Sequence, residues 1–422
     1  MIKLPLFTKE NLFLKNILFV ASGNSFGKFL AIIVTPILTR IYSPENFGVL
    51  NLFITSVTIL GVFSTFRYAT AIPIERDNLF SKNLIYLCLL ILLLITFSSG
   101  IIILFFGSDI LYLLNATELN KFLWLFPIAI LGKGFYEIFL NWSIKEKYFT
   151  VLTKSKIYQN INSSLSKLLL GYLGYLNFGL IFGHLLQEIS GSLIIFRKYI
   201  SKNKNLFSDF DFKAIKINAL KYKKFPLFQI WSQLILTFNS NLIVFFILTI
   251  YGKATLGFYA LAISITSIPI NIIGQSVSQV YYGEISSIGT QSMNKIRLLT
   301  NSILKKMLMI IVIPLLFIFF YGEIIFGFIF GNEWYISGAF ASFLVPLIFS
   351  KFLVAPIASI FNFLQKQSIQ FYLNIAKLLL VISIFSFSYY GSFSIEKTIL
   401  IYSFCLALFN FFVLVIAYRL LR

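Results

Sequence analysis

Long apolar runs, repeated along the chain, limit what it can fold into. Each run is about twenty residues long, the length that an α-helix needs to cross a hydrocarbon core roughly 30 Å thick. Of the 422 residues, 58% are hydrophobic and 12% are charged, whereas soluble domains carry about 25% charged residues. The sequence therefore predicts an all-α, polytopic membrane protein with about 12 transmembrane helices.

We place the helices from the apolar runs and the polar residues between them. The predicted spans are residues 17–39, 47–72, 83–106, 122–144, 157–177, 178–196, 227–250, 255–282, 303–329, 337–364, 371–390 and 398–418. The run after Lys15 lacks an A-x-A-like cleavage site and is too long for the apolar part of a signal peptide, so we expect a retained first helix. In residues 157–196, two short helices fit better than one helix with a re-entrant segment.

The net charge of +20 lies mostly on one side of the predicted membrane. With the N-terminus inside, the inner segments hold most of the lysines and arginines, including Lys145, Lys147, Lys154 and Lys156 and the basic stretch 197–224. The basic residues left for the outer face are Arg40, Lys121, Lys253 and Lys397. Because cytoplasmic loops of membrane proteins are enriched in Lys and Arg, both termini are expected in the cytoplasm. No basic surface interleaved with aromatic residues suggests nucleic acid.

Signatures of an enzyme, a metal site or a bound cofactor are not found in the sequence. A single histidine, His184, excludes a two-histidine metal site, and there is no P-loop for ATP hydrolysis. Asp209 and Asp211 have the D-x-D spacing of some glycosyltransferases, but a solvated basic loop explains them better. Cys88 and Cys405 lie within apolar runs and are expected to be buried rather than disulfide-bonded. We expect no enzymatic activity and no cofactor.

The two halves of the chain repeat a short motif. Residues 41–50 read IYSPENFGVL, and residues 250–259, which lie 209 positions further on, read IYGKATLGFY. Each copy is a turn that joins the first two helices of a six-helix half, and because six is even, both halves have the same orientation. We therefore expect two six-helix lobes related by a parallel pseudo-two-fold axis, residues 1–200 and 226–422, joined by a basic cytoplasmic linker, residues 201–225.

Ionisable residues inside the predicted spans mark a candidate site, because a charge at the bilayer centre costs roughly 3 kcal/mol on insertion scales. The candidates for binding substrate are Lys28, Lys167, Lys351, Lys133, Lys377 and Arg67. Glu137 and Glu188 are candidates for binding a coupling ion. Since the lysines outnumber the glutamates, we expect a water-filled cavity with a surplus of positive charge.

Structural roles are alternatives for several of these residues. Lys133 and Glu137, at positions i and i+4 of one helix, can neutralise each other. Lys377 and Arg67 can extend toward the inner membrane interface. His184 lies one turn from Glu188, but a histidine in such a place is more often a satisfied core residue.

A cationic pocket within the membrane suits an anionic group that has to cross it. A pyrophosphate head group would meet each lysine as a point charge. Sugar hydroxyls would suit the polar side chains near Lys167, which are Asn160, Asn162, Ser163, Ser164 and Ser166. The helices are interrupted by Pro36, Pro269, Pro314, Pro346 and Pro356. Such bends are common in transporters with a binding site near the bilayer midplane.

Two stretches resemble a known family. Residues 35–48, TPILTRIYSPENFG, and 66–73, FRYATAIP, resemble the N-terminal signature of polysaccharide-biosynthesis membrane proteins, the O-antigen flippases. In the second half, LGFYALA at residues 256–262, Pro269 and GQSVSQV at residues 274–280 are similar to the same family. The resemblance covers the whole chain in its layout, but these motifs mark the family and not its substrate.

The resemblance implies a twelve-helix exporter fold related to multidrug and toxin extruders and to lipid-linked peptidoglycan-precursor flippases. It implies translocation of an undecaprenyl-pyrophosphate-linked oligosaccharide, an O-antigen or related surface unit, across the bacterial inner membrane. A polymerase and a chain-length regulator of the same pathway are then expected partners. The alternatives are a cation-coupled multidrug exporter of the same fold and, less favoured, a membrane glycan polymerase or glycosyltransferase, which would need a larger outer loop.

The charge asymmetry generates a topology prediction. Reporter fusions after Lys204 should behave as cytoplasmic, and fusions at Asn115 or Lys253 should behave as external, because lysines and arginines collect in the inner loops. A pair of reporters, one active only inside and one active only outside, measures this at each position. Cytoplasmic behaviour at Lys253 would contradict both the span assignment and the parallel repeat.

Overall fold

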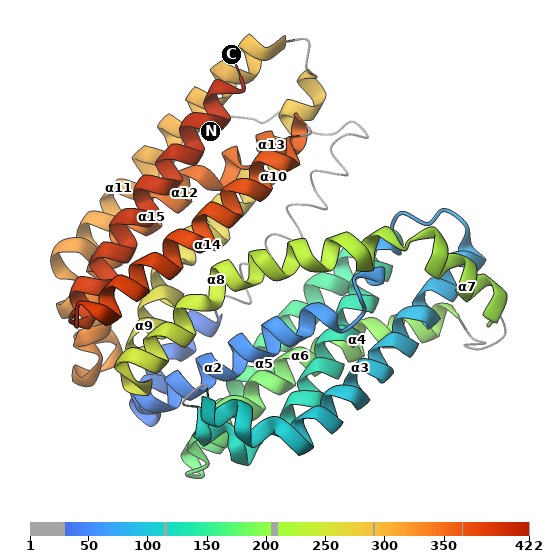
Figure 1. Cartoon of the computed structure of the whole chain (residues 1–422), viewed down its shortest axis with the longest axis horizontal. Coiled ribbons are helices and arrows are strands. Elements are labelled where there is room, and N and C mark those ends of the chain that lie inside the picture. The colour runs from blue at the N-terminus through green and yellow to red at the C-terminus, as the bar shows by residue number, and fades with distance from the viewer. Residues whose placement is uncertain (1–29, 114–115, 204–209, 290–291, 365, 422) are drawn as a thin grey trace, which may run out of the picture. The chain divides into compact units, whose positions relative to one another are not determined.

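The computed structural model describes residues 30–113, 116–203, 210–289, 292–364 and 366–421. Throughout these ranges the chain is helical and contains no strand, which confirms the all-α class (Figure 1). The chain divides into two compact units. One comprises Leu52–Leu234 with the described part of Met1–Ile41, and the other comprises Tyr42–Asn51 with Ile235–Arg422. The lobe boundaries inferred from the repeat stay a prediction.

The first half of the chain contains six α-helices longer than three turns and one short one. After the helix Leu30–Ile41 come α2 (Pro44–Leu60), the 3₁₀ helices η1 (Gly61–Phe63) and η2 (Tyr68–Ala71), α3 (Asn78–Leu113), η3 (Thr117–Phe122), α4 (Leu125–Lys145), α5 (Phe149–Tyr172), α6 (Leu176–Lys202) and α7 (Phe212–Lys221). Within this unit α3 packs on α4, and α6 packs on both α4 and α5 (Figure 1).

The second half begins with a π-helical turn, η4 (Phe225–Gln229). It continues with α8 (Ile230–Tyr251), α9 (Lys253–Thr266), η5 (Ile270–Gly274), α10 (Gln275–Ile288), α11 (Met293–Phe330), η7 (Asn332–Trp334), α12 (Tyr335–Ile357), α13 (Ser359–Phe363), α14 (Gln367–Tyr390) and α15 (Ile395–Arg419). In its unit, α12 is central, because it packs on α9, α11 and α15 (Figure 1).

Eight of the described helices are long and apolar enough to cross a membrane, or nine if the bent pair Lys253–Thr266 and Ile270–Ile285 forms one span. The helices α4 and α5 also have spanning length, but they are less apolar because they carry Lys133, Glu137 and Lys167. The first predicted span lies partly outside the described residues. The multi-pass architecture inferred from the apolar runs is thus confirmed.

Several of the predicted spans have different ends in the structure. The second span was expected to continue to residue 72, but α2 ends at Leu60 and the chain turns, with Phe66 and Arg67 at φ of 46° and 62°. Residues 157–196 form two helices, as predicted, with Gly174 at φ +81° in the turn between them. Both helices extend further than predicted, α5 from Phe149 and α6 to Lys202.

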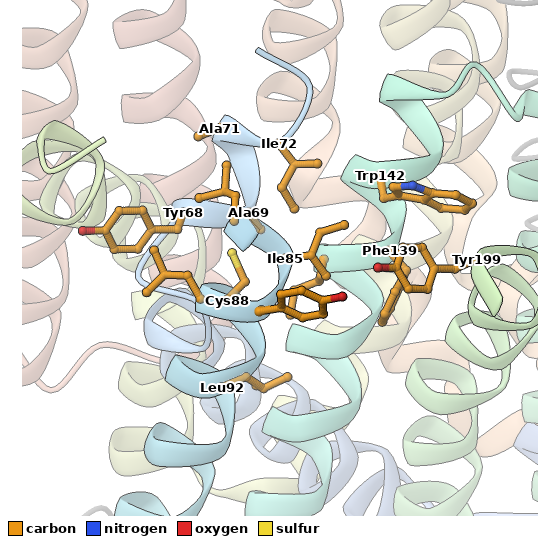
Figure 2. Close-up of a cluster of buried hydrophobic side chains, with 14 of the residues drawn as sticks. Tyr68, Ala69, Ala71, Ile72, Ile85, Cys88, Leu92, Phe139, Trp142 and Tyr199 are labelled. Carbon is orange, nitrogen blue, oxygen red and sulfur yellow. The ribbon is translucent and has the colours of Figure 1, made fainter. Parts of the chain in front are cut away.

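An aromatic core fills the part of the first unit between η2, α3, α4 and α6. Figure 2 shows Phe139, Trp142 and Tyr199 gathered at one edge of this core. The rings of Trp142 and Tyr199 meet edge to face with centroids 5.0 Å apart, and those of Phe139 and Tyr199 are 5.1 Å apart. Buried aromatic pairs of this kind add about 0.5–1.5 kcal/mol beyond their area.

Glycine and proline shape the helices around α12. A Cβ on Gly338 would overlap the carbonyl oxygen of Gly322 on α11, so the two backbones touch. Pro346 lacks an N–H and disturbs the preceding turn of α12. The N–H of Leu347 then donates to Ser403 Oγ of α15, at 3.1 Å. A neighbouring helix therefore satisfies a backbone N–H of α12 beside Pro346.

The linker between the halves contains a docked helix. On α7, Ala214, Ile215 and Asn218 are buried, and Asn218 Nδ2 donates to the carbonyl of Phe80 at the start of α3 (2.8 Å). The backbone N–H of Asp211 donates to Asn83 Oδ1 (2.9 Å). The basic stretch thus packs on the first unit through Ala214, Ile215 and Asn218, whereas Phe212, Ile217 and Leu220 are exposed.

Glu75 is the electrostatic anchor of this docked helix. Its side chain is 4% exposed; Lys221 Nζ lies 2.5 Å and Tyr222 Oη 3.0 Å from Glu75 Oε2. Burial raises the pKa of Glu75, but the hydrogen bonds from Lys221, the Asp77 N–H and Tyr222 outweigh it, so that the pKa lies below its usual value. The hydrogen bond to Glu75 raises the pKa of Lys221.

We expect acid to loosen α7. The pKa of Glu75 is lower in the folded state than in the unfolded state, so its stabilising contribution is present above the unfolded pKa and is lost as pH falls through the folded pKa. Because Lys221 is half exposed and screened, the loss should be about 1 kcal/mol, or about fivefold in the protection of α7 amides from hydrogen exchange.

Hydrogen exchange of α7, corrected for the intrinsic effect of pH, measures this loss. In Glu75→Gln the pH dependence should disappear, whereas Glu396→Gln, a change at an exposed glutamate of α15, should retain it. An unchanged pH dependence in Glu75→Gln would show that another group controls the docking.

Candidate functional site

Five of the predicted site residues gather in the first unit, together with His184. This charge cluster consists of Arg67 from the turn after η1, Lys133 and Glu137 of α4, Lys167 of α5, and His184 and Glu188 of α6. Lys133 and Glu137, like His184 and Glu188, are separated by four residues, so each pair lies on one face of its helix. All six side chains are buried or half-buried.

Arg67 and Glu137 form the direct ion pair of the charge cluster. Arg67 Nη1 lies 2.8 Å from Glu137 Oε1, and the two side chains are 19% and 21% exposed. From the sequence, Arg67 was expected either to bind substrate or to extend toward the inner membrane interface. In the structure its side chain contacts Glu137. This requires a left-handed backbone at Arg67, which costs about 1–3 kcal/mol for a residue other than glycine.

Hydrogen bonds from distant segments hold the strained turn in place. The Thr70 hydroxyl donates to the Arg67 carbonyl (2.7 Å) and lies 3.0 Å from Oε1 of Gln229, the last residue of η4. The hydroxyl of Tyr68 donates to the carbonyl of Ala219 on α7 (3.0 Å). The linker that joins the two halves therefore also positions Arg67.

Lys133 lies between the two carboxylates of the charge cluster. Both Glu137 and Glu188 attract it electrostatically. Its side chain crosses Gly61 at the end of α2, where an added Cβ would lie 2.7 Å from Lys133 Cδ. The i, i+4 pairing with Glu137 is thus part of a larger arrangement, in which Arg67 and Lys133 together offset two carboxylates.

Glycines on α6 make room for polar side chains of α5. An added Cβ on Gly183 would lie 2.5 Å from Lys167 Cγ, and one on Gly191 would overlap the Gln159 amide. Ser155 Oγ donates to the carbonyl of Gly191 (3.0 Å). The stem of Lys167 thus lies flat on α6, and its charge adds a third cation to the charge cluster.

His184 is buried beside the charges. It is 9% exposed, its ring meets Phe53 edge to face at 6.3 Å, and its Nε2 lies 3.9 Å from Glu188 Oε1. The positive charges of Lys167 and Lys133 are both within electrostatic range of the imidazole. Its burial and its contact with Phe53 are in keeping with the core role weighed for it.

The second unit contains a separate pair of lysines. Lys351 on α12 and Lys377 on α14 repel each other electrostatically. A polar seam adjoins Lys351, since Asn410 Nδ2 of α15 donates to Ser350 Oγ (3.0 Å). Near Lys377, Asn239 Nδ2 of α8 donates to the Asn374 carbonyl (2.8 Å). Lys28 lies outside the described residues, and the substrate roles of all these lysines stay predictions.

Sequence reasoning missed the supporting residues. Gln159 and Gln187 lie beside the charge cluster, and Ser163 Oγ is 3.5 Å from Gln187 Oε1. Because their side chains are polar and lie within apolar runs, both residues could have been predicted from the sequence to adjoin the site. No signal marked the turn at Phe66 and Arg67, because neither residue is a type that favours positive φ.

The arrangement can bind an anion or exchange a cation. Three fixed cations, Arg67, Lys133 and Lys167, face two carboxylates, Glu137 and Glu188, which leaves a surplus of positive charge. In the described part of the chain no group of three or more His, Cys, Asp and Glu side chains could bind a metal ion. The charge cluster can therefore interact with a ligand through the charges of its side chains.

The Arg67–Glu137 pair can be tested by a double-mutant cycle. Arg67→Met and Glu137→Gln should each lower stability by about 1–3 kcal/mol, because each leaves a buried charge without its partner. The double variant should lose less than the sum, by about 0.5–3 kcal/mol. Thermal unfolding of the purified protein in detergent measures all four states.

The exposed pair Lys202–Glu146 provides the control. Its coupling should be below about 1 kcal/mol, because solvent screens it. Equal coupling in the two pairs, or strict additivity at Arg67 and Glu137, would contradict the assignment of the buried pair.

Comparison with known proteins identifies the family and the fold. Residues 37–339 match the model of a family described as polysaccharide biosynthesis protein. No curated protein sequence matches the chain.

The similar solved structures are membrane transporters. One is described as the inward-facing conformation of a multidrug resistance MATE family transporter of the MOP superfamily, with a TM-score of 0.70, 15% identity and 94% of each chain covered. Another is a MOP superfamily transporter from Pyrococcus furiosus, with a TM-score of 0.63, 15% identity and 96% of each chain covered. A third is the eukaryotic MATE transporter AtDTX14, at 0.60, with 14% identity and 97% and 98% covered.

These matches agree with the family resemblance and with the all-α, multi-pass membrane fold expected from the sequence. The family match covers well over half of the chain, including both copies of the repeated motif. The structural matches cover nearly its whole length. The chain therefore belongs to the family of polysaccharide biosynthesis proteins and is a multi-pass membrane protein with the fold of the MOP superfamily transporters.

Proposed function

We propose that the chain is a flippase for a lipid-linked oligosaccharide whose head group is joined to an undecaprenyl carrier through pyrophosphate. The glycan would be an O-antigen or a related surface polysaccharide unit, as in lipopolysaccharide assembly. The observation that carries the proposal is the surplus of buried cations, in a member of a polysaccharide biosynthesis family. Transport requires no covalent step, so we propose that the chain is not an enzyme.

Charge chemistry explains why lysines suit this cargo. A pyrophosphate that enters a low-dielectric interior needs fixed positive partners, since a charge pair at 4 Å is worth about 4 kcal/mol at an effective dielectric constant of 20 and about 1 kcal/mol in water. Lys351 and Lys377 repel each other, and an anion placed near both would relieve that repulsion. Lys167 adds a further positive charge to the charge cluster, beside His184.

The two carboxylates suggest how transport is driven. Glu137 and Glu188 both attract Lys133, so loss or gain of a proton or cation at either one changes the balance around it. The strained turn at Arg67 contributes to this balance because it brings a second cation to Glu137. We infer that Glu137 and Glu188 bind the coupling ion, while the lysines bind the cargo.

We place the protein in the bacterial inner membrane with both termini in the cytoplasm. The support is the concentration of lysines and arginines in the inner loops, including the exposed lysines of α7. In this orientation the lobes would alternate between inward and outward access while the lipid tail stays in the bilayer. A polymerase and a chain-length regulator of the same pathway would act on the exported unit.

A cation-coupled multidrug exporter is the second candidate, because several of the similar structures are MATE transporters. A pocket for organic cations would favour acidic side chains, and the described cluster has more cations than carboxylates. The superfamily member from Pyrococcus furiosus was described as having a binding pocket of reverse polarity that suggests a different function. Pocket polarity can thus differ among proteins of this fold.

Charge reversal tests the proposed function. Lys351→Glu and Lys167→Glu should each lower glycan export by more than tenfold, because repulsion replaces attraction. Lys→Ala should have a smaller effect, and Lys→Arg should keep partial activity, since the charge remains but the shape changes. The assay is surface glycan in a bacterial strain that lacks its own flippase, with membrane abundance measured alongside.

The matched control is Lys216→Glu on the exposed face of α7, which should leave export unchanged because water and salt screen it. Full export by both reversed variants at normal abundance would show that these lysines do not bind the cargo. If the same variants lowered efflux of a cationic dye while glycan export persisted, the result would favour a multidrug exporter instead.

A further inference from the structure

Lys156 is a further cation beside the charge cluster, although from the sequence it was expected in an inner loop. In the structure it lies within α5, which begins at Phe149. Its Nζ lies 4.7 Å from the centroid of the Tyr136 ring on α4, and Tyr136 directly precedes Glu137 of the charge cluster. Lys156 is half-buried, whereas Lys154, which lies two residues earlier on the same helix, is exposed. The two neighbouring lysines therefore have different surroundings.

The packing of α5 on α6 brings Lys156 close to Glu188. The hydroxyl of Ser155, the residue before it, donates to the carbonyl of Gly191 (3.0 Å). Gly191 follows Glu188 by three residues, which is about 4.5 Å along the helix. The positive charge of Lys156 attracts the carboxylate of Glu188 electrostatically. Because a lysine carries its charge on a flexible four-carbon stem, the ammonium can change partner without a movement of the backbone.

Glu188 lacks a permanent cationic partner. Arg67 pairs with Glu137 at 2.8 Å, and Lys133 is attracted by both carboxylates of the charge cluster. Among the described residues, the basic nitrogen within ion-pair distance of Glu188 is Nε2 of His184, at 3.9 Å, and an imidazole is charged only when it is protonated. A carboxylate that is removed from water and has no cation is strongly disfavoured. An ion that leaves Glu188 therefore has to be replaced.

The ring of Tyr136 binds the ammonium of Lys156 without neutralising it. The face of an aromatic ring carries partial negative charge and attracts an ammonium group, but more weakly than a carboxylate does. The Tyr136 side chain is 8% exposed and belongs to the aromatic core of the first unit, so its position is fixed by packing. None of the ion pairs between described residues includes Lys156. Its ammonium is therefore available to a carboxylate that loses its cation.

We propose that Lys156 is an internal counter-ion for Glu188. It rests on the ring of Tyr136 while a proton or another cation occupies the carboxylate, and it pairs with Glu188 when that ion leaves. This inference rests on the coupling role proposed above for Glu188. Because Lys156 competes with the coupling ion for the same carboxylate, it promotes release of that ion to water and keeps the empty site neutral.

Carbodiimide labelling of the purified protein tests the counter-ion without any cargo. Dicyclohexylcarbodiimide reacts with buried carboxyl groups in their protonated form, and peptide mass spectrometry identifies the modified residue. In Lys156→Gln, labelling of Glu188 should be about threefold faster, because a carboxylate that has lost a nearby cation is protonated more often. Lys154→Gln is the matched control and should leave the rate unchanged, since that lysine is exposed. Labelling of Glu137, which keeps Arg67, should also stay the same.

Removal of the ring should have the opposite effect. In Tyr136→Leu the ammonium of Lys156 loses its aromatic partner and is more often at Glu188, so labelling of Glu188 should be about threefold slower than in the wild type. Tyr136→Phe keeps the ring face and should label at the wild-type rate. A purely structural role of Lys156 would not shift the rate in opposite directions in the two variants. Equal labelling of Glu188 in the wild type, Lys156→Gln and Tyr136→Leu would overturn the inference.

Glycan export, measured alongside, separates this inference from the proposed function. Lys156→Gln should lower export about fivefold, and Lys156→Arg should retain more of it because the charge remains. If labelling changes as expected while the wild type exports no glycan, the counter-ion stands and the cargo assignment fails. If glycan is exported but labelling is equal in all variants, the cargo assignment stands and Lys156 is a structural residue. Should Lys156→Gln fail to accumulate in the membrane, the comparison of Tyr136→Leu with Tyr136→Phe decides the question.

Discussion

Close approach of helix backbones at glycine organises this protein. In lipid, apolar side chains gain little by moving from the bilayer to another helix, so helices associate through tight packing and hydrogen bonds, and small residues allow that packing. Among the described residues, backbones meet in this way where α11 contacts α12 at Gly322 and Gly338 and where α2 contacts α9 at Gly48 and Gly257, while Gly183 and Gly191 of α6 make room for side chains of α5. The rest of the architecture follows from these contacts.

The buried charges depend on the same contacts. Lys133 crosses Gly61 and Lys167 crosses Gly183, so each ammonium group reaches the interior along a surface from which a side chain is missing. A charge held this way is shielded from lipid without the helices being pushed apart. The ion pair of Arg67 with Glu137 completes the arrangement, at the cost of an unfavourable backbone conformation that neighbouring segments hold in place.

The sequence predicted the features that depend on composition and repetition. Apolar runs identified the membrane fold, and the division of residues 157–196 into two helices was predicted, although the turn lies a few residues earlier, at Gly174. It did not predict the end of α2 at Leu60 or the docked helix α7, because both depend on hydrogen bonds to segments far away in the chain, such as Asn218 with Phe80. The charge cluster was predicted as a set of residues, but its direct partners were not. Spacing within one helix favoured Lys133 as the partner of Glu137, whereas the turn after η1 brings in Arg67.

The reciprocal form of the contact at Gly48 and Gly257 has a consequence for the history of the chain. If one six-helix ancestor had assembled with a second copy of itself, a single glycine in its first turn would have supplied both halves of this interface at once. Fusion of two such genes would then preserve the contact while freeing each copy to change. In the present chain both copies have glycine at this position, while Pro44 faces one glycine and Lys253 the other.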